Sequence, residues 1–532
     1  MFLGVALAFI AGIWWWSAQP ISLPRAPIDP QAKLECVSYA PFRNGQTPLD
    51  ETTVISAEQI ADDLKRLAEI TDCVRTYSIG NGLDQVPALA QKAGLKVIHG
   101  IWLGSNRLKN RQQIETSIAL AKQYPDVIIA VVVGNEVLLR GEMTSSDLAA
   151  TIRYVKSQVG NIPVTYADVW EYWLRYREIY EAVDFVTIHI LPYWEDFPIP
   201  ARNAAAHVDS IRKQVAVAFP NKEILIGETG WPSEGRMREG ALPSRANQAR
   251  VVSEILALAR SENFRVNLIE AYDQPWKRQL EGTVGGYWGL MDATNRAPKY
   301  PPGQPISNFP RWRSEMAAGL VYCFLVFATG WLAQRRKPWS PPLTAWLWVA
   351  VSAAAGGTLL GFAFEKLMVE SHGLGPALKW GVLFGAGILS PFIAAVALLA
   401  GQPLPTLIEL VGPRQLRERG ALALLLGAVL LVAVGIGSET ALGFVFDPRY
   451  RDFPYAALTM AVLPLALVSL QNPRGAGTRQ IAENLYAGLL ALSVLYIAIN
   501  ETLANWQSDW TCAAYLVLAV TLSRARAAQI RE

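Results

Sequence analysis

The sequence predicts an α/β fold in two parts: a (β/α)8 TIM barrel followed by an all-α domain with several transmembrane helices. Up to about residue 300, short apolar runs alternate with amphipathic stretches, which is the pattern of a parallel barrel. Two of these runs end directly in a glutamate, as strands that deliver side chains to a barrel rim do. Beyond residue 316, nearly every segment is a long apolar block.

The composition supports this division. Of 532 residues, 52% are hydrophobic and only 17% are charged, which is too apolar for an ordinary soluble protein. The net charge of +3 is small, and basic residues cluster in loops beside the apolar blocks, which argues against nucleic-acid binding. The expected domains are an N-terminal transmembrane anchor or signal at 1–18, a linker at 19–33, a catalytic barrel at 34–305, a seven-helix transmembrane domain at 316–523 and a cytoplasmic tail at 524–532.

The N-terminal block spans residues 2–16 and ends in three tryptophans, which favour a lipid boundary. It is short for a membrane span and no basic region precedes it, so a cleaved signal peptide and a retained anchor both fit. We favour the anchor, because no Ala-x-Ala cleavage pattern follows.

Eight apolar runs are the expected barrel strands, since each is too short for a helix. They are 36–40, 73–78, 96–102, 127–133, 163–167, 185–191, 223–227 and 267–272. Amphipathic stretches lie between them, and Ser56 with Gln59 three residues on predicts the N-terminus of the first helix. The expected helices are 57–69, 111–123, 146–158, 204–219 and 245–262.

The last third of the chain holds seven apolar blocks, several of them near the ~20 residues that span a bilayer. They are 316–334, 343–364, 380–401, 421–437, 453–470, 484–503 and 509–523. Every second loop is rich in positive charge, with eleven basic residues against four in the alternate loops. Because basic loops stay cytoplasmic, the sequence predicts eight spans with the N-terminal block and a barrel on the non-cytoplasmic face. The eleven are Arg335, Arg336, Lys337, Arg414, Arg417, Arg419, Arg474, Arg479, Arg524, Arg526 and Arg531.

The four cysteines are too few for a disulfide scaffold. Cys36 and Cys73 each open an expected strand, whereas Cys323 and Cys512 lie inside apolar blocks. If the barrel is exported, Cys36 and Cys73 can pair, and two buried free thiols are the alternative.

Three acidic residues fall at the rim of the expected barrel. Glu136 follows the fourth strand, Glu228 follows the seventh, and Glu270 lies within the eighth. A single glutamate there is more often a helix cap or part of a loop ion pair than a catalytic residue. Two together provide the carboxylate pair that glycosidic bond cleavage requires, one to protonate the leaving oxygen and one to attack or activate water.

Two motifs carry a family resemblance. Gly134-Asn135-Glu136 and residues 226–233 resemble the acid/base and nucleophile motifs of glycoside hydrolase family 17, the β-1,3-glucanases and β-1,3-glucan transglycosylases. The resemblance covers roughly residues 34–302 and also rests on segments 38–42, 74–77, 192–193, 270–277, 288–290 and 298–300. Two features depart from it: Gln274 replaces an acidic residue of the plant members, and the loop at 275–287 is short.

The resemblance implies that Glu136 acts as general acid and then base, that Glu228 is the nucleophile of a covalent glycosyl-enzyme, and that Asn135 binds the sugar 2-OH. A basic residue beside one carboxylate would keep it ionised, and Arg75 is the candidate, with a structural ion pair as the alternative. The tyrosines expected to orient Glu228 or the sugar are Tyr39, Tyr77 and Tyr193.

Tryptophans cluster in or just after the strand ends, at Trp170, Trp173, Trp194, Trp231, Trp276 and Trp288. Sugar rings stack on aromatic faces and their hydroxyls need polar partners. We expect Trp231, Trp276 and Trp288 to contact substrate; packing at the barrel top is the alternative. The expected polar partners are Glu270, Asp273 and Lys277, and His189 is either a rim residue or a core histidine.

The resemblance implies a membrane-anchored, retaining β-1,3-glucan-active enzyme of a bacterial inner membrane with a periplasmic barrel, similar to β-(1,6)-glucan synthases. It uses no cofactor and no metal, and its partners are a β-glucan, the lipid bilayer and a glucan synthase. Transglycosylation that remodels or branches glucan is favoured over plain hydrolysis, although both share the first half-reaction. A glucan-binding or export accessory protein is the alternative of another class. The chain lacks the Asp-x-Asp triplet and the Gln-x-x-Arg-Trp motif of a nucleotide-sugar polymerase.

Overall fold

The computed structural model describes residues 1–21, 23, 33–300, 304–337, 339–411, 420–473 and 478–527. Most of the expected linker, and Arg414, Arg417, Arg419, Arg474 and Arg531, lie outside these described residues. The chain divides into two compact units. The barrel unit comprises Ile21–Glu234 and Gly240–Ile306, and the helical unit comprises Met1–Pro20, Gly235–Glu239 and Ser307–Glu532.

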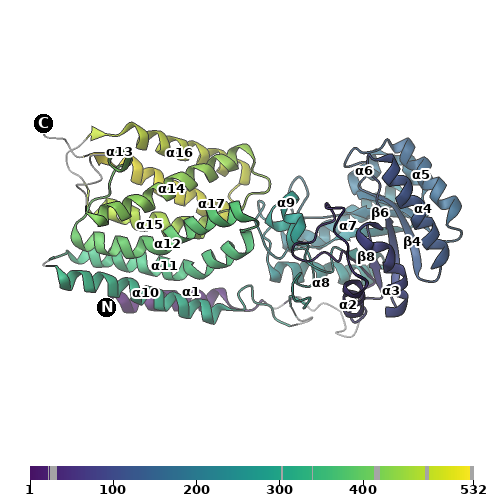
Figure 1. Ribbon diagram of the computed structural model, residues 1–532, viewed down its shortest axis with the longest axis horizontal. Helices are drawn as coiled ribbons and strands as arrows, with labels where there is room; N and C mark the ends of the chain where they lie inside the picture. The colour runs from purple at the N-terminus through teal and green to yellow at the C-terminus, as the bar shows by residue number, and fades with distance from the viewer. Residues whose placement is uncertain are drawn as a thin grey trace. The chain divides into compact units, whose positions relative to one another are not determined.

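Eight parallel strands close the barrel in sequence order, which confirms the predicted fold class (Figure 1). The strands are β1 (Cys36–Ser38), β2 (Cys73–Arg75), β3 (Lys96–Ile101), β4 (Ile128–Asn135), β5 (Val164–Val169), β6 (Val186–His189), β7 (Ile224–Thr229) and β8 (Arg265–Leu268). The carboxyl ends of all eight strands therefore meet at one rim, where barrel enzymes carry their working residues.

The strand ends differ from the prediction where the chain turns toward the rim. Glu228 lies inside β7 rather than after it. Glu270 follows β8 rather than lying within it, because the strand ends at Leu268 and the Glu270 amide donates to the carbonyl of Trp288, 3.3 Å away. Both acids still stand at the same rim.

The helices of the barrel unit surround the strands (Figure 1). They are α2 (Ala57–Leu67), α3 (Val86–Ala93), α4 (Arg107–Gln123), α5 (Ser145–Gln158), α6 (Trp170–Arg175), α7 (Ala201–Ala218), α8 (Arg245–Glu262) and α9 (Arg278–Glu281). The expected start of α2 is confirmed, since the Ser56 hydroxyl accepts a hydrogen bond of 3.2 Å from the amide of Gln59. This satisfies one of the free amides of the first turn.

A disulfide joins Cys36 and Cys73, the first residues of β1 and β2. Of the two readings of these cysteines, the bonded pair is therefore the one found. Strands β1 and β2 are neighbours in the barrel, with Val37 in register with Val74. The bond lies at the amino ends of the strands, at the opposite end from the rim.

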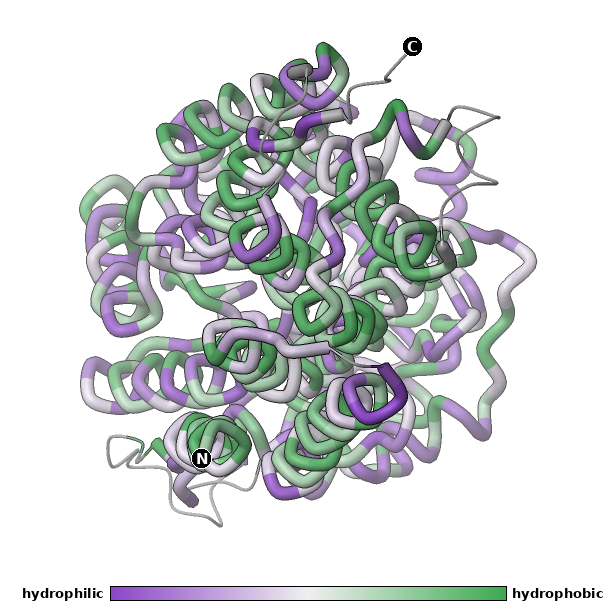
Figure 2. Tube along the Cα trace, turned by 90° about the vertical axis from the view of Figure 1, so that its left-hand side faces the viewer, coloured by the Kyte–Doolittle hydropathy of each residue, from purple (hydrophilic) through white to green (hydrophobic). Residues whose placement is uncertain are grey.

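The helical unit contains nine helices among the described residues. They are α1 (Phe2–Ser17), α10 (Trp312–Arg336), α11 (Leu343–Glu370), α12 (Leu374–Ala400), α13 (Leu407–Val411), α14 (Ala421–Phe446), α15 (Tyr455–Gln471), α16 (Ile481–Glu501) and α17 (Trp506–Ser523). Five of them, α10, α11, α12, α14 and α16, are long and apolar enough to cross a membrane. Helices α1 and α15 are apolar but shorter. Figure 2 shows the coils of this unit largely in the colour of apolar residues.

Helices α10 and α11 approach each other closely through glycines. A Cβ added at Gly319 would lie 2.2 Å from the carbonyl oxygen of Gly357, and one added at Gly357 would lie 2.6 Å from that of Gly319. Small residues that let helix backbones touch are the usual means of helix association in a bilayer, where burial from water gives no drive.

The segment Gly235–Glu239 belongs to the helical unit although it connects β7 to α8. Arg236 is buried and forms an ion pair with Glu501, the last residue of α16. The Asn505 amide group donates to the other Glu501 oxygen at 2.7 Å and to the carbonyl of Met237 at 3.0 Å. Both carboxylate oxygens are thus engaged, as a buried charge requires.

Candidate active site

The backbone turns sharply where β4 delivers Glu136 to the rim. Gly134 and Glu136 both have positive φ, at 89° and 51°. At Gly134 a Cβ would also lie 2.7 Å from the Val137 side chain, so glycine is required there. A left-handed backbone is rare for glutamate and marks a position that the surroundings hold in place.

Glu228 is buried on β7 and faces the barrel interior. Its neighbour in register on β6 is His189. The Arg75 Nη1 group donates to Glu228 Oε1 at 3.1 Å and to the carbonyl of Gly227 at 2.8 Å. The guanidinium thus places a positive charge directly beside this carboxylate.

Arg75 lies at the end of β2 and is fully buried. Its Nη2 group donates to the side-chain oxygen of Asn135 at 2.6 Å, and its guanidinium lies 4.8 Å from the centre of the Tyr77 ring. Arg75 therefore connects β2, β4 and β7, and the predicted contact between Arg75 and Glu228 is present.

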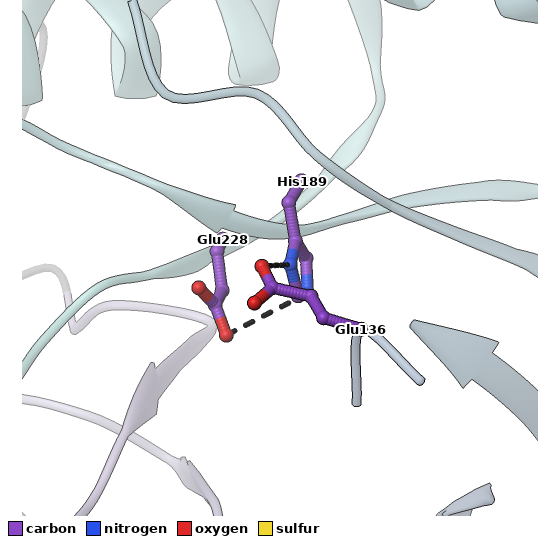
Figure 3. Close-up of side chains that lie close together, drawn as sticks. All are labelled: Glu136, His189 and Glu228. Atoms are coloured by element: carbon purple, nitrogen blue, oxygen red, sulfur yellow. Dashed lines mark hydrogen bonds and ion pairs between the residues drawn. The ribbon is translucent and has the colours of Figure 1, made fainter. Parts of the chain in front are cut away.

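His189 stands between the two glutamates at the end of β6. Its Nδ1 atom lies 2.8 Å from Glu136 Oε1, and its Nε2 atom lies 3.6 Å from Glu228 Oε1. Figure 3 shows the three side chains pointing toward one another. Of the two interpretations of His189 from the sequence, the rim residue is the one found, although the side chain is fully buried.

The two carboxylates stand close together. Oxygen atoms of Glu136 and Glu228 and a nitrogen of His189 all lie within 4.8 Å of one another. Such a group can in principle hold a cation, but the Arg75 guanidinium already supplies the positive charge at Glu228. We therefore assign Glu136 and Glu228 as a pair of carboxylates, in which Arg75 provides the positive charge beside Glu228. Retaining glycosidases space their carboxyl groups by about 5–5.5 Å, whereas inverting enzymes need about 6.5–9.5 Å.

The surroundings of Glu136 favour its charged form. Burial raises the pKa of Glu136, but the hydrogen bond from His189 and the charges of Arg140 and Arg75 outweigh burial, so the pKa lies below its usual range. Nearby Asp168 behaves in the opposite way, because burial raises its pKa to about 6. The charged form of Glu136 is the one that acts as a general base.

A second charged group follows β8. Lys277 donates to both oxygens of the buried Glu270 at 3.2 Å. Burial raises the pKa of Glu270 to about 7, against the opposing charge of Lys277. Burial also raises the pKa of Glu281 on α9, and the charges of Glu136 and Glu228 raise it further against that of Lys277. Lys277 therefore sits among several carboxylates at the rim.

Four predicted substrate contacts are corrected by burial. The Tyr39 hydroxyl donates to Asp63 at 3.2 Å, and the Trp231 indole donates to the carbonyl of Leu242 at 3.0 Å. Asp273 accepts from Lys299 at 2.6 Å and from the Gly289 amide at 2.9 Å. Tyr193 is fully buried, with its ring 6.0 Å from that of Trp231. These four side chains are buried and held by neighbouring residues of the barrel top.

The remaining predicted contacts lie nearer the opening. Trp276 and Tyr77 are partly exposed. The Trp276 indole donates to Gln274 at 2.9 Å, and the Tyr77 hydroxyl donates to Ser38 at 2.9 Å. Trp288 is buried beneath Trp194, with the rings stacked at 6.5 Å. Trp276 and Tyr77 are therefore better placed for substrate than Trp288.

Sequence reasoning missed Trp102 and Arg140. Trp102 directly follows β3 and is 40% exposed, and the Arg140 guanidinium lies 4.2 Å from its ring centre. Arg140 also donates to the carbonyl of Leu103 at 2.8 Å. The signal was available for Trp102, an aromatic residue at a strand end, but the pairing with Arg140 depends on the turn after Glu136.

The barrel unit is similar to known glycoside hydrolases. Residues 36–289 match the family model of the BtgE/BtgC glycoside hydrolase domain. A probable β-glucosidase btgE of Neosartorya fischeri is 28% identical over 265 residues, covering 49% of this chain and 46% of that protein. A glucan 1,3-β-glucosidase of Saccharomyces cerevisiae is 26% identical over 269 residues, covering 46% of this chain and 85% of that protein.

A solved glycoside hydrolase family 17 β-1,3-glucanosyltransferase of Rhizomucor miehei is 25% identical, with a TM-score of 0.43, and the match covers 51% of this chain and 96% of that one. The chain spans about half the length of the btgE relatives that it matches. This match over residues 36–289, together with the glucosidase relatives, confirms the resemblance to glycoside hydrolase family 17.

Proposed function

We propose that the barrel cleaves β-1,3-glucan with retention of configuration, with Glu228 as nucleophile and Glu136 as acid and base. The observation that carries this proposal is the spacing of the pair, whose oxygens lie within 4.8 Å. Such a close approach of one oxygen from each carboxylate supports the separation of about 5–5.5 Å found in retaining enzymes over the about 6.5–9.5 Å of inverting ones. The names of the two curated relatives, both β-glucosidases, support the substrate class.

In the first half-reaction, a Glu228 oxygen forms a bond to the anomeric carbon while the bond to the leaving oxygen breaks. Glu136 gives its proton to that leaving oxygen. In the second half-reaction, the Glu136 carboxylate takes a proton from the incoming hydroxyl, whose oxygen replaces Glu228 at the anomeric carbon. Arg75 pairs with the Glu228 carboxylate before attack and again when this carboxylate leaves the anomeric carbon.

Water or a sugar hydroxyl can supply the second half-reaction. We favour transfer to a sugar, because an enzyme fixed to the membrane is suited to remodelling or branching a glucan as a partner synthase delivers it. Plain hydrolysis is the alternative. Product analysis on laminari-oligosaccharides separates the two: products longer than the substrate, or with β-1,6 linkages, support transfer, and reducing sugar alone rejects it.

Sugar contacts belong to the residues that stay accessible or polar at the rim. Asn135 accepts from Arg75 and stands beside Glu136, where a sugar 2-OH would lie. Trp276, Tyr77 and Lys277 are partly exposed around the pair. Trp276→Ala should raise KM more than it lowers kcat, as loss of a stacking platform does.

The helical unit is proposed as a membrane anchor that holds the barrel outside a bacterial inner membrane. Five helices long enough to span, and the greater positive charge of alternate loops, support this topology. The Cys36–Cys73 disulfide is an independent support, because such bonds persist in oxidising compartments such as the periplasm. Protease added to spheroplasts should digest the barrel; a protected barrel would reject the topology.

Trapping the covalent intermediate tests the chemistry itself. An activated 2-fluoro-β-glucoside should label the protein once, on the peptide that contains Glu228. Glu228→Gln should abolish the label. Labelling of Glu270 instead, the other buried rim carboxylate, would overturn the assignment of the nucleophile.

A further inference from the structure

His189 connects the two proposed catalytic glutamates through one line of polar contacts. On one side its Nδ1 atom lies 2.8 Å from Glu136 Oε1. On the other side its Nε2 atom lies 3.5 Å from Nη2 of Arg75, whose Nη1 donates to Glu228. His189, Arg75 and Glu228 are all buried, so bulk water does not compete for these contacts.

The neighbours of His189 fix where its proton lies. The Nε2 atom faces Nη2 of Arg75 at 3.5 Å, which can only donate, and Oε1 of Glu228 at 3.6 Å, which can only accept. Because Glu228 Oε1 already accepts from Arg75 at 3.1 Å and lies beyond hydrogen-bond distance of Nε2, we take Nε2 as the acceptor of the Arg75 proton. The ring proton then sits on Nδ1 and is donated to Glu136 Oε1. The contact with Arg75 thus determines which ring nitrogen carries the proton, and that nitrogen faces Glu136.

This arrangement makes the two oxygens of Glu136 unequal. Oε1 accepts the proton of His189, whereas Oε2 makes no hydrogen bond to the residues that the structure describes. The Glu136 side chain is 24% exposed, while His189 and Glu228 lie beneath it. A catalytic proton on Oε1 would meet the N–H of His189 directly and is therefore disfavoured.

We infer that His189 is a positioning residue: it holds Oε1 of Glu136, so that Oε2 gives the proton to the leaving group and takes it back from the acceptor. The inference rests on the proposed function of Glu136. His189 keeps its Nδ1 proton in both half-reactions, and Glu136 is the group that gives and takes the proton.

Other charged groups also face Glu136 and must be counted in any pH experiment. Those on the neighbouring elements are His189 on β6, Arg75 on β2, Arg140 after β4, Tyr166 and Asp168 on β5, Glu228 on β7 and Glu281 on α9. Only His189 donates a hydrogen bond to the Glu136 carboxylate among the described residues. Its removal should therefore change the proton position, while Arg140 and Arg75 keep their charge.

The leaving group of the substrate tests this role. His189→Leu should lower kcat/KM on laminari-oligosaccharides by about 10- to 100-fold, the loss expected for one hydrogen bond to a charged group. On dinitrophenyl β-laminaribioside, whose leaving group needs no proton, the loss should stay below about threefold. An equal loss on both substrates would mean that His189 is merely structural and would overturn the inference.

The conservative variant and the pH profile sharpen the test. In His189→Asn, the amide nitrogen takes the place of Nδ1 and should restore most of the rate on oligosaccharides, even if the leucine variant folds poorly. In His189→Leu, the basic limb of the kcat/KM profile should move to higher pH, because the donor that favours charged Glu136 is gone. An unmoved limb, or an asparagine variant no better than leucine, would contradict the role.

A readout without substrate separates this inference from the proposed function. The chain has four histidines, so ¹⁵N-histidine labelling with His189→Asn as the difference assigns the signal. The full-length protein in detergent should show His189 protonated on Nδ1. A ring that carries its proton on Nε2 alone would overturn the inference. If the tautomer is as expected but no glucan is cleaved, the proposed function fails instead.

Discussion

Both units bury charged side chains, but the two arrangements differ in what they leave open. In the helical unit, the Glu501 oxygens are both engaged, one by Arg236 and the other by Asn505. In the barrel unit, Glu136 has one oxygen held by His189 and the other without a hydrogen bond among the described residues. A carboxylate with both oxygens engaged can hold structure, whereas one with an oxygen left open to substrate can react.

The difference shows that burial of charge alone does not identify an active site. Arg75 and Arg236 are equally buried, and each pairs with a glutamate. What distinguishes Arg75 is its place at the carboxyl ends of parallel strands, beside a second carboxylate on a strained backbone. A substitution in the barrel pair should therefore lower the rate, whereas one in the pair of the helical unit should lower the stability.

The largest effect is expected at the reacting pair. Glu228→Gln should lower kcat/KM on laminari-oligosaccharides by at least about 10³-fold, because an amide cannot form the covalent intermediate. The rate is measured on the folded protein, because removing the charge beside the buried Arg75 also lowers the melting temperature. Glu501→Gln is the matched control, a buried glutamate of the helical unit, and it should keep the rate. Comparable rate losses in the two variants would remove the distinction drawn between the two ion pairs.

The next effect concerns stability in the helical unit. Arg236→Ala should destabilise the protein by about 3–5 kcal/mol, because it leaves the Glu501 charge buried and unpaired. Thermal unfolding in detergent measures this loss. Arg236→Ala combined with Glu501→Leu should recover much of it, since no isolated charge remains. A single variant as stable as the wild type would show that Glu501 reaches water.

The disulfide gives a third effect, in the barrel unit but far from the rim. Cys36 and Cys73 are 37 residues apart, and closing a loop of that length stabilises by about 3–4 kcal/mol. Cys36→Ser with Cys73→Ser should lower the melting temperature and keep kcat/KM of the folded protein. Dithiothreitol should reproduce the shift in the wild type and not in the double variant. A loss of rate at full folding would connect this end of the barrel to the site.

The sequence predicted what depends on local pattern. Glu136 and Glu228 could be found because each ends a short apolar run, and eight such runs close a barrel. The sequence has no comparable local pattern that predicts which aromatic residues at the rim are buried. Trp231 follows a strand as Trp276 does, but it turns inward because the carbonyl of Leu242, in the next loop, accepts its indole proton.

Partners distant in the chain explain the other misses. Asp273 has a side chain typical of sugar-binding residues, but Lys299, 26 residues later, donates a hydrogen bond to it and balances its charge. His189 gave no signal of its own, since an apolar strand can carry a satisfied core histidine. Only the register of β6 beside β7 brings it level with Glu228. Long-range pairing of this kind is fixed by tertiary packing and has no local motif.

The smallest effect tests how burial acts on the rim charges that do not react. Burial raises the pKa of Glu270 to about 7, so the folded state binds this proton more tightly than the unfolded state. Its stabilising contribution is complete below about pH 4 and is lost as the pH rises to about 7. Glu270→Gln carries no such proton, and it should therefore gain about 1–3 kcal/mol relative to the wild type between these pH values. Urea unfolding at a series of pH values measures the difference, with the exposed change Glu115→Gln on α4 as control. If the difference in the free energy of unfolding between wild type and Glu270→Gln does not change with pH, Lys277 keeps Glu270 charged throughout. The rim then contains a permanently charged ion pair, as the helical unit does.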